Sequence, residues 1–385
     1  MSATRILTAL LLLAALFTPT CQSQQLGKTV MIPAGSEADR QLNAISAADP
    51  FQKLALIDQF AKAYPEGDMQ IAVDEQYVNY YINAKQYDKA FEYGDKLFAL
   101  DPNNYVNAVN MVRAAAEKGD LDRLYTYGEK ANSIVQAFKG APPPEGTNVA
   151  DWDHAKDEKL TAIKEDQDYV EQALLSGAYN AKDPSKKADC FVRFAKMYPG
   201  TPQGEQALMM AASAYQQAQN RAKMQEVANG ALAKDPNNID MLLLLADDYS
   251  EKGDQLDKAE VNAKKALSLV DTAKKPDGVS DEQWQQQTSV QKGWALSTLG
   301  QIDLQKKQEA QAVDNLLKAA PLLKSNPAMY ARNEYRLGYG YLNLKKKADA
   351  TKAFTEAASV DSPYKAMAQQ KLAELGNVKP RKKAS

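Results

Sequence analysis

The sequence predicts an all-α chain, built as an array of antiparallel helix pairs that stack on one another. Two observations in the 385 residues predict it. The stretch 331–364 places small and large side chains at the spacing of a packed helix pair. A block beginning at Asp49 also recurs 134 residues later, from Asp183. Because each pair can bury its apolar face only against the next, repeated pairs indicate a solenoid.

The stretch 331–364 gives this pattern most clearly. Its marker positions are Leu337, Gly338, Tyr341, Ala350, Phe354, Ala357 and Pro363. Gly338 and Ala350 are small where two helices of a pair cross, and Ala357 is small where the next pair stacks. Tyr341 and Phe354 fill the space between the helices. The proline after the second helix stops it from continuing.

This spacing resembles the tetratricopeptide (TPR) repeat, a pair of antiparallel helices of ~34 residues. The resemblance implies a right-handed α-α superhelix whose first helices line a concave face that binds partners. It covers most of 49–375. The weaker copies are 71–104, 105–138, 205–238, 239–272 and 293–326. Residues 365–376 are expected to form a capping helix at the end of the array.

The recurrence is a tandem duplication, and it sets the predicted organisation. Phe60-Ala-Lys-Ala-Tyr-Pro65 returns as Phe194-Ala-Lys-Met-Tyr-Pro199. Asp before Pro is expected to cap a helix start, and Tyr-Pro to end it. We predict a first TPR block, a second block, and a C-terminal TPR with its cap, at 49–182, 183–320 and 321–376. The Pro- and Gly-rich loops 139–152 and 272–284 interrupt the stacking, and the sequence leaves open whether the solenoid continues across them.

The first 23 residues are typical of a secretory signal peptide. Arg5 supplies the positive start, and residues 6–17 form an apolar run too short to span a bilayer comfortably. Cys21 is either removed with this segment or retained as a lipidated first residue. We expect an exported chain, periplasmic or secreted, with no membrane span. Residues 24–48 are expected to be a linker, and 377–385 a solvated basic tail.

Composition excludes several functions. A formal net charge of −2 argues against nucleic acid or a membrane surface as the partner. His154 is the single histidine and Cys190 the single cysteine beyond the leader, so no catalytic triad or metal site can be assembled from them. We expect a solvated His154 and a buried Cys190. The sequence therefore predicts a protein that is not an enzyme and uses no cofactor or metal.

The concave face supplies the candidate binding residues. Aromatic, arginine and asparagine side chains suit such a surface because they combine contact area with hydrogen bonding. The candidates are Tyr335, Arg336, Tyr339 and Asn343 near the C-terminus, and Asn79, Asn83, Asn110 and Arg113 near the N-terminus. The family's clamp for a C-terminal carboxylate is incomplete, because Glu75 stands where it needs lysine. For the tyrosines, simple packing between helices remains an alternative.

We therefore predict an exported scaffold or adaptor that holds a protein or peptide partner in its concave groove. A resemblance of the Phe-Ala-Lys-x-Tyr-Pro element to helices of bacterial envelope-assembly TPR proteins favours the cell envelope. The alternative is a periplasmic protein that binds a small molecule or glycan near Trp152 and Trp284, which follow the duplicated loops. That alternative requires exposed indole rings.

Overall fold

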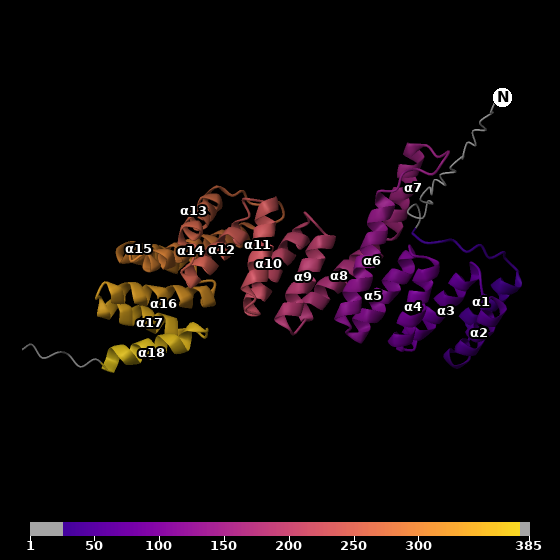
Figure 1. Ribbon diagram of the computed structural model, residues 1–385, viewed down its shortest axis with the longest axis horizontal. Helices are drawn as coiled ribbons and strands as arrows, with labels where there is room; N and C mark the ends of the chain where they lie inside the picture. Colours follow the sequence, from indigo (N-terminus) through magenta and orange to yellow (C-terminus); the bar gives the residue numbers. More distant parts are fainter. Residues whose placement is uncertain (1–25, 378–385) are drawn as a thin grey trace, which may run out of the picture. The chain divides into compact units, whose positions relative to one another are not determined.

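The computed structural model describes residues 26–377, all of whose regular elements are α-helices. The predicted signal peptide, Cys21 and residues 378–385 of the basic tail lie outside the described residues. The eighteen described helices are α1 (Glu37–Ala47), α2 (Pro50–Ala63), α3 (Met69–Asn83), α4 (Tyr87–Leu100), α5 (Tyr105–Lys118), α6 (Leu121–Lys139), α7 (Val149–Ala162), α8 (Lys164–Asn180), α9 (Pro184–Met197), α10 (Pro202–Gln217), α11 (Arg221–Lys234), α12 (Ile239–Lys252), α13 (Leu256–Thr272), α14 (Asp281–Gln305), α15 (Glu309–Leu322), α16 (Pro327–Asn343), α17 (Lys347–Ser359) and α18 (Tyr364–Asn377). The predicted all-α array of helix pairs is confirmed (Figure 1).

The duplication is visible helix by helix. The bounds of α2, α4 and α5 recur 134 positions later as those of α9, α11 and α12. Asp183 caps α9 by accepting a hydrogen bond from the Lys186 N–H at 2.8 Å, and Tyr64 and Tyr198 end α2 and α9 before their prolines. The loop after α6 leads into two helices, α7 and α8, where the second copy has the single long helix α14.

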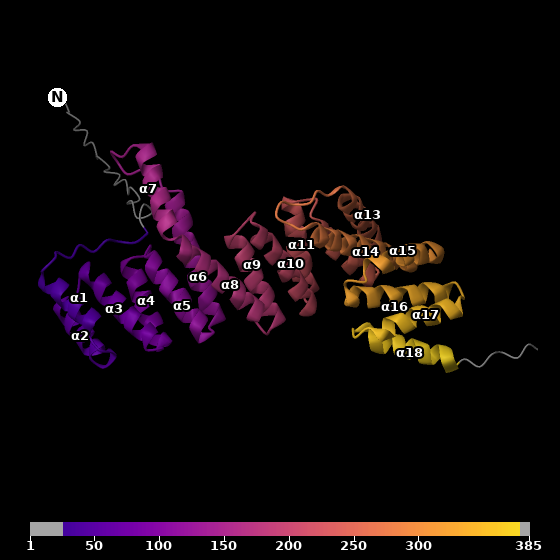
Figure 2. The same cartoon turned by 180° about the vertical axis from the view of Figure 1, so that it is seen from behind.

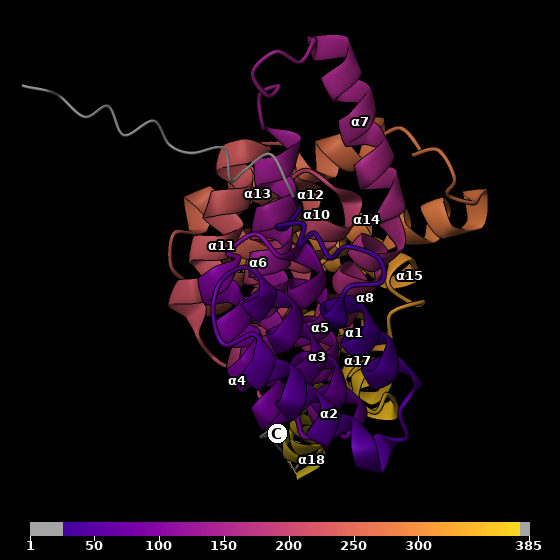
Figure 3. The ribbon, with the colours of Figure 1, turned by 90° about the vertical axis from the view of Figure 1, so that its right-hand side faces the viewer.

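The described residues form two compact units, 26–199 and 200–377. The division falls after α9 rather than at the predicted block boundary 182/183, because α9 packs against α6 and α8. In unit 1, α8 also packs against α5, while α7 projects from the body of the unit (Figure 3). In unit 2, α16, α17 and α18 stack in succession (Figure 2). Within the described residues, no helix is both long enough and apolar enough to cross a membrane.

The segment 24–48, predicted to be a linker, is in part helical. Residues 24–48 include α1, whose Ser36 cap accepts a hydrogen bond from the Asp39 N–H at 3.2 Å. Ile45 buries its side chain where α1 packs against α2. The composition of this segment resembles a linker because α1 is a short, mostly polar helix that buries only Ala38 and Ile45.

The close helix crossing predicted at Gly338 is confirmed. A Cβ at Gly338 would lie 2.6 Å from Cε1 of Phe354, and Ala350, Phe354 and Ala357 are all fully buried. Tyr339 packs edge-on against the Phe354 ring, with centroids 5.7 Å apart. The ring therefore has little room to move away from a new methyl group.

Gly338→Ala is expected to destabilise unit 2 by ~1–3 kcal/mol, because it overpacks this crossing. The matched control is Gly230→Ala, at a helical position where a Cβ meets no atom within 4 Å. The control is expected to stabilise by up to ~1 kcal/mol through helix propensity. Thermal unfolding of both variants checks the pair. Equal shifts in the two would contradict the predicted close crossing.

Candidate partner-binding grooves

The four C-terminal candidates gather along one groove of unit 2, which we call the C-terminal groove. It is a cavity of about 610 Å³ between α14, α16 and the start of α18. Its lining residues are Glu251, Gln301, Leu304, Gln305, Tyr335, Arg336, Tyr339, Asn343, Pro363, Tyr364 and Met367. The sequence analysis did not single out Tyr364 and Met367, which only the packing of α18 brings to the site.

Tyr335 and Tyr339 form the aromatic wall of the C-terminal groove. Both rings are half-buried, and their hydroxyl oxygens lie 3.3 Å apart. Tyr335 also packs against Tyr364, with centroids 5.5 Å apart. Asn343 and Met367 are exposed at the edge of the groove. The tyrosines thus pack between helices, as the alternative from the sequence has it, and the rest of each ring faces the groove. Their role in partner binding stays a prediction.

Arg336 lines the same groove, and its side chain is only 4% exposed. Its guanidinium donates to Ser297 Oγ at 3.1 Å and to Asp247 Oδ1 at 3.1 Å, and it pairs with Glu251. Arg332 binds the other oxygen of Asp247 at 2.6 Å. The side chain of Arg336 therefore connects α16 to α12 and α14, and holds the wall of the groove in position.

The charge balance of this network favours an ionised Asp247. Burial alone would raise the pKa of Asp247, but the charges of Arg332 and Arg336 outweigh it and hold that pKa below its ordinary value. The Thr298 hydroxyl adds a hydrogen bond at 3.2 Å. A carboxylate with two arginine partners and a hydroxyl has its buried charge compensated.

The four N-terminal candidates lie along a second groove, in unit 1. Two neighbouring cavities of about 530 and 310 Å³ share Asn79, Val106 and Asn110, and together we call them the N-terminal groove. Asn83 and Arg113 line the smaller cavity. Arg113 is engaged within the unit, donating to Asp166 Oδ1 at 2.8 Å with its guanidinium 4.4 Å from the centre of the Tyr169 ring.

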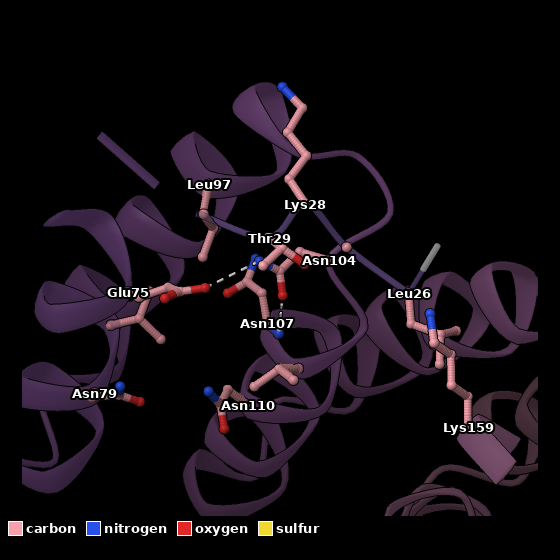
Figure 4. Close-up of a pocket in the computed structure, with 13 residues that line it drawn as sticks. Leu26, Lys28, Thr29, Glu75, Asn79, Leu97, Asn104, Asn107, Asn110 and Lys159 are labelled. Atoms are coloured by element: carbon pink, nitrogen blue, oxygen red, sulfur yellow. Dashed lines mark hydrogen bonds between the residues drawn. The ribbon is translucent and has the colours of Figure 1, made fainter. Parts of the chain in front are cut away.

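The larger cavity has a polar floor that sequence reasoning missed (Figure 4). Asn104 donates from Nδ2 to Glu75 Oε1 at 3.3 Å, and Asn107 donates from Nδ2 to the Gly94 carbonyl at 2.8 Å. Burial raises the pKa of Glu75, and the nearby Asp101 carboxylate raises it further, against the bond from Asn104. The sequence could have indicated this floor through a comparison of the two copies. Glu75 and Asn107 are polar, whereas the equivalent residues of the second copy are Met209 and Met241.

Trp152 does not provide the exposed ring that the glycan alternative requires. It is 6% exposed, donates its indole N–H to the Ala141 carbonyl at 3.0 Å, and packs edge-on against Phe138. The tryptophan therefore anchors the loop that precedes α7. Trp284 is half-exposed at the start of α14.

His154 and Cys190 are the remaining residues that could take part in catalysis or bind a metal. The His154 side chain is 74% exposed, 3.7 Å from Glu158, in agreement with a solvated histidine. Cys190 is buried as predicted, and burial raises the pKa of its thiol to about 11. Residues 26–377 contain no group of three or more His, Cys, Asp or Glu side chains arranged to hold a metal ion.

The helix pairs and their small-residue crossings define an all-α helical-repeat fold, the fold that the resemblance to the tetratricopeptide repeat predicts. No protein-family model matches the chain, and no curated protein matches it in sequence. Among solved structures it is similar to a chain of the APC/C hetero-tetramer Cut9–Hcn1, with 14% identity and a TM-score of 0.43 over 88% of this chain and 62% of that one. Yeast Tom70 is 13% identical over 92% of this chain and 66% of that one, with a TM-score of 0.37. NprR, in complex with its cognate peptide NprX, is 15% identical over 88% and 80%, with a TM-score of 0.30.

Proposed function

We propose that the chain is an exported scaffold that binds a protein partner in the C-terminal groove, in the setting of the cell envelope. The observation that carries the proposal is the gathering of Tyr335, Tyr339, Tyr364 and Met367 around one cavity of about 610 Å³. Aromatic and methionine side chains dominate the binding energy of protein interfaces because they give large contact areas. The amides of Gln301, Gln305 and Asn343 at the same cavity supply hydrogen-bond donors and acceptors.

The function depends on a partner that presents an apolar anchor to this groove. A photo-crosslinking amino acid placed at Asn343, which is exposed at the groove, is expected to link the chain to one envelope protein. The double change Tyr339→Ala, Met367→Ala is expected to lower capture of that protein at least tenfold, since a hot-spot tyrosine contributes ~2 kcal/mol or more.

The matched control is the double change Lys318→Ala, Lys352→Ala, at exposed positions of unit 2 outside the groove lining. It is expected to leave capture unchanged. Circular dichroism verifies that both variants keep their helix content. Equal capture by the groove variant and the control, with both folded, would place the partner elsewhere.

A further inference from the structure

The floor of the N-terminal groove carries polar side chains that the fold does not require. Glu75 on α3, and Asn107 and Asn110 on α5, line its larger cavity. The positions 134 residues later in the second copy hold Met209, Met241 and Leu244, and Met241 and Leu244 are buried there. The duplicated helices therefore pack with apolar residues at these places. Polar groups that are costly to bury, where apolar ones suffice, indicate a binding site.

The Glu75 carboxylate on this floor has no cationic partner among the described residues, although Lys28 and Lys159 also line the cavity. Within residues 26–377, Glu75 accepts a hydrogen bond from the Asn104 amide and has the Asp101 carboxylate nearby, and no lysine or arginine contributes to the shift of its pKa. Asn107 is 1% exposed, and its Oδ1 accepts no hydrogen bond. The cavity thus combines a desolvated carboxylate with an unused acceptor oxygen. A group that both carries positive charge and donates hydrogen bonds would satisfy the two together.

The same cavity already accommodates a stretch of main chain. Residues 26–29 line it, with the Lys28 N–H donating to Asp101 Oδ2 at 2.8 Å and the Tyr105 N–H donating to the Leu26 carbonyl at 3.1 Å. The side chain of Lys28 points away from Glu75 (Figure 4). A chain segment can therefore bind along this edge through backbone hydrogen bonds, while the charge of Glu75 remains without a cationic partner.

We propose that the N-terminal groove binds the lysine or arginine side chain of an extended segment of a protein partner. The ammonium or guanidinium group donates to the Glu75 carboxylate and to Asn107 Oδ1, and the amides of Asn79 and Asn110 bind the backbone of the segment. This chemistry is opposite in sign to a carboxylate clamp, in agreement with glutamate rather than lysine at position 75. The inference rests on the proposed scaffold function and adds a second contact with defined specificity.

The test uses the purified full chain with selectively ¹⁵N-labelled asparagine, titrated with the pentapeptide Ala-Ala-Lys-Ala-Ala, acetylated and amidated. The side-chain amide signals of Asn107 and Asn110 report binding at the cavity. The same peptide with norleucine in place of lysine keeps the alkyl chain and removes the charge. We expect the lysine peptide to shift both signals and the norleucine peptide to bind at least about tenfold more weakly, as expected for loss of a charge-assisted hydrogen bond.

Glu75→Gln is expected to lower the affinity for the lysine peptide by at least about tenfold. The control Glu92→Gln, at an exposed position of α4, is expected to leave the affinity unchanged. Glu75→Met, which installs the residue of the second copy, is expected to abolish binding and to leave the melting temperature equal or higher. Equal binding of the two peptides, binding of neither, or a loss of folding in Glu75→Met overturns the proposal. The crosslinking experiment measures partner binding at the C-terminal groove. It therefore tests the scaffold function independently of the peptide titration at the N-terminal groove.

Discussion

Replacing Arg336 with alanine is expected to lower the free energy of unfolding of unit 2 by about 3–5 kcal/mol, because it breaks a buried charge network. The substitution leaves Asp247, 2% exposed, with Arg332 as its remaining cationic partner. It also frees the Ser297 carbonyl and hydroxyl on α14. Urea unfolding, followed by hydrogen exchange of the α16 amides, measures the loss.

Two controls separate the network from a general effect of removing a charge. Lys318→Ala breaks an exposed i,i+4 pair with Asp314 and is expected to cost less than about 0.5 kcal/mol. The triple change Asp247→Leu, Arg332→Met, Arg336→Met removes the buried carboxylate together with both arginines, and replacing a buried ion pair by apolar residues often costs no stability. It is expected to restore most of the loss. An Arg336→Ala variant within 1 kcal/mol of the parent would contradict the assignment.

The triple variant also tests whether Arg336 contacts the partner directly. It retains Tyr335, Tyr339 and Asn343 while it removes the guanidinium of Arg336 from the groove wall. If partner capture survives in the triple variant, Arg336 acts by positioning the wall rather than by touching the partner. A simple Arg336→Ala variant cannot make this distinction, because its loss of stability would itself remove the groove.

The fold could be predicted because its determinants are local in sequence. Gly338 and Phe354 meet across one helix pair, and the Asp-Pro and Tyr-Pro pairs mark helix ends through backbone sterics alone. The helix α1 escaped prediction because it is only eleven residues long and mostly polar, within a segment whose Gln, Ser, Gly and Pro content is typical of a linker. The division after α9 also escaped, since it depends on packing against α6 and α8 rather than on the duplication.

The candidate sites could be predicted in part, for a reason that lies in helix geometry. Tyr335, Tyr339 and Asn343 are spaced by four residues and so share one face of α16. Arg336 is offset by one residue, on the face it shares with Arg332. Its partner Asp247 lies 89 positions away, so the ion pair that buries it leaves no signal at short range. The polar floor around Glu75 likewise required knowing which side chains the helices bring together.

Glu334 is expected to make the stability of unit 2 depend on pH near neutrality. Its side chain lies on α16 and is 5% exposed. Burial raises the pKa of Glu334 to about 7, and the negative charge of Glu356 adds to the increase. The Asn333 amide and the charge of Lys324 lower the pKa in part. Because the folded pKa exceeds the unfolded value near 4.5, the folded state binds the proton more tightly. The stabilisation is fully present below about pH 4.5 and is lost as the pH rises through about 7. At pH 8 the ionised side chain costs up to about 3 kcal/mol.

Glu334→Gln keeps the shape of the protonated side chain and removes its titration. The variant is expected to equal the parent near pH 4.5 and to exceed it by up to about 3 kcal/mol at pH 8. Urea unfolding of parent and variant between pH 4.5 and 8 measures the difference, in which the titration of the other groups cancels. Glu282→Gln, at an exposed position of α14, is the matched control and should follow the parent throughout. If the free energies of unfolding of Glu334→Gln and the parent differ by the same amount at every pH in this range, Glu334 is ionised in the folded state throughout. Neighbouring groups would then compensate the cost of burying its charge.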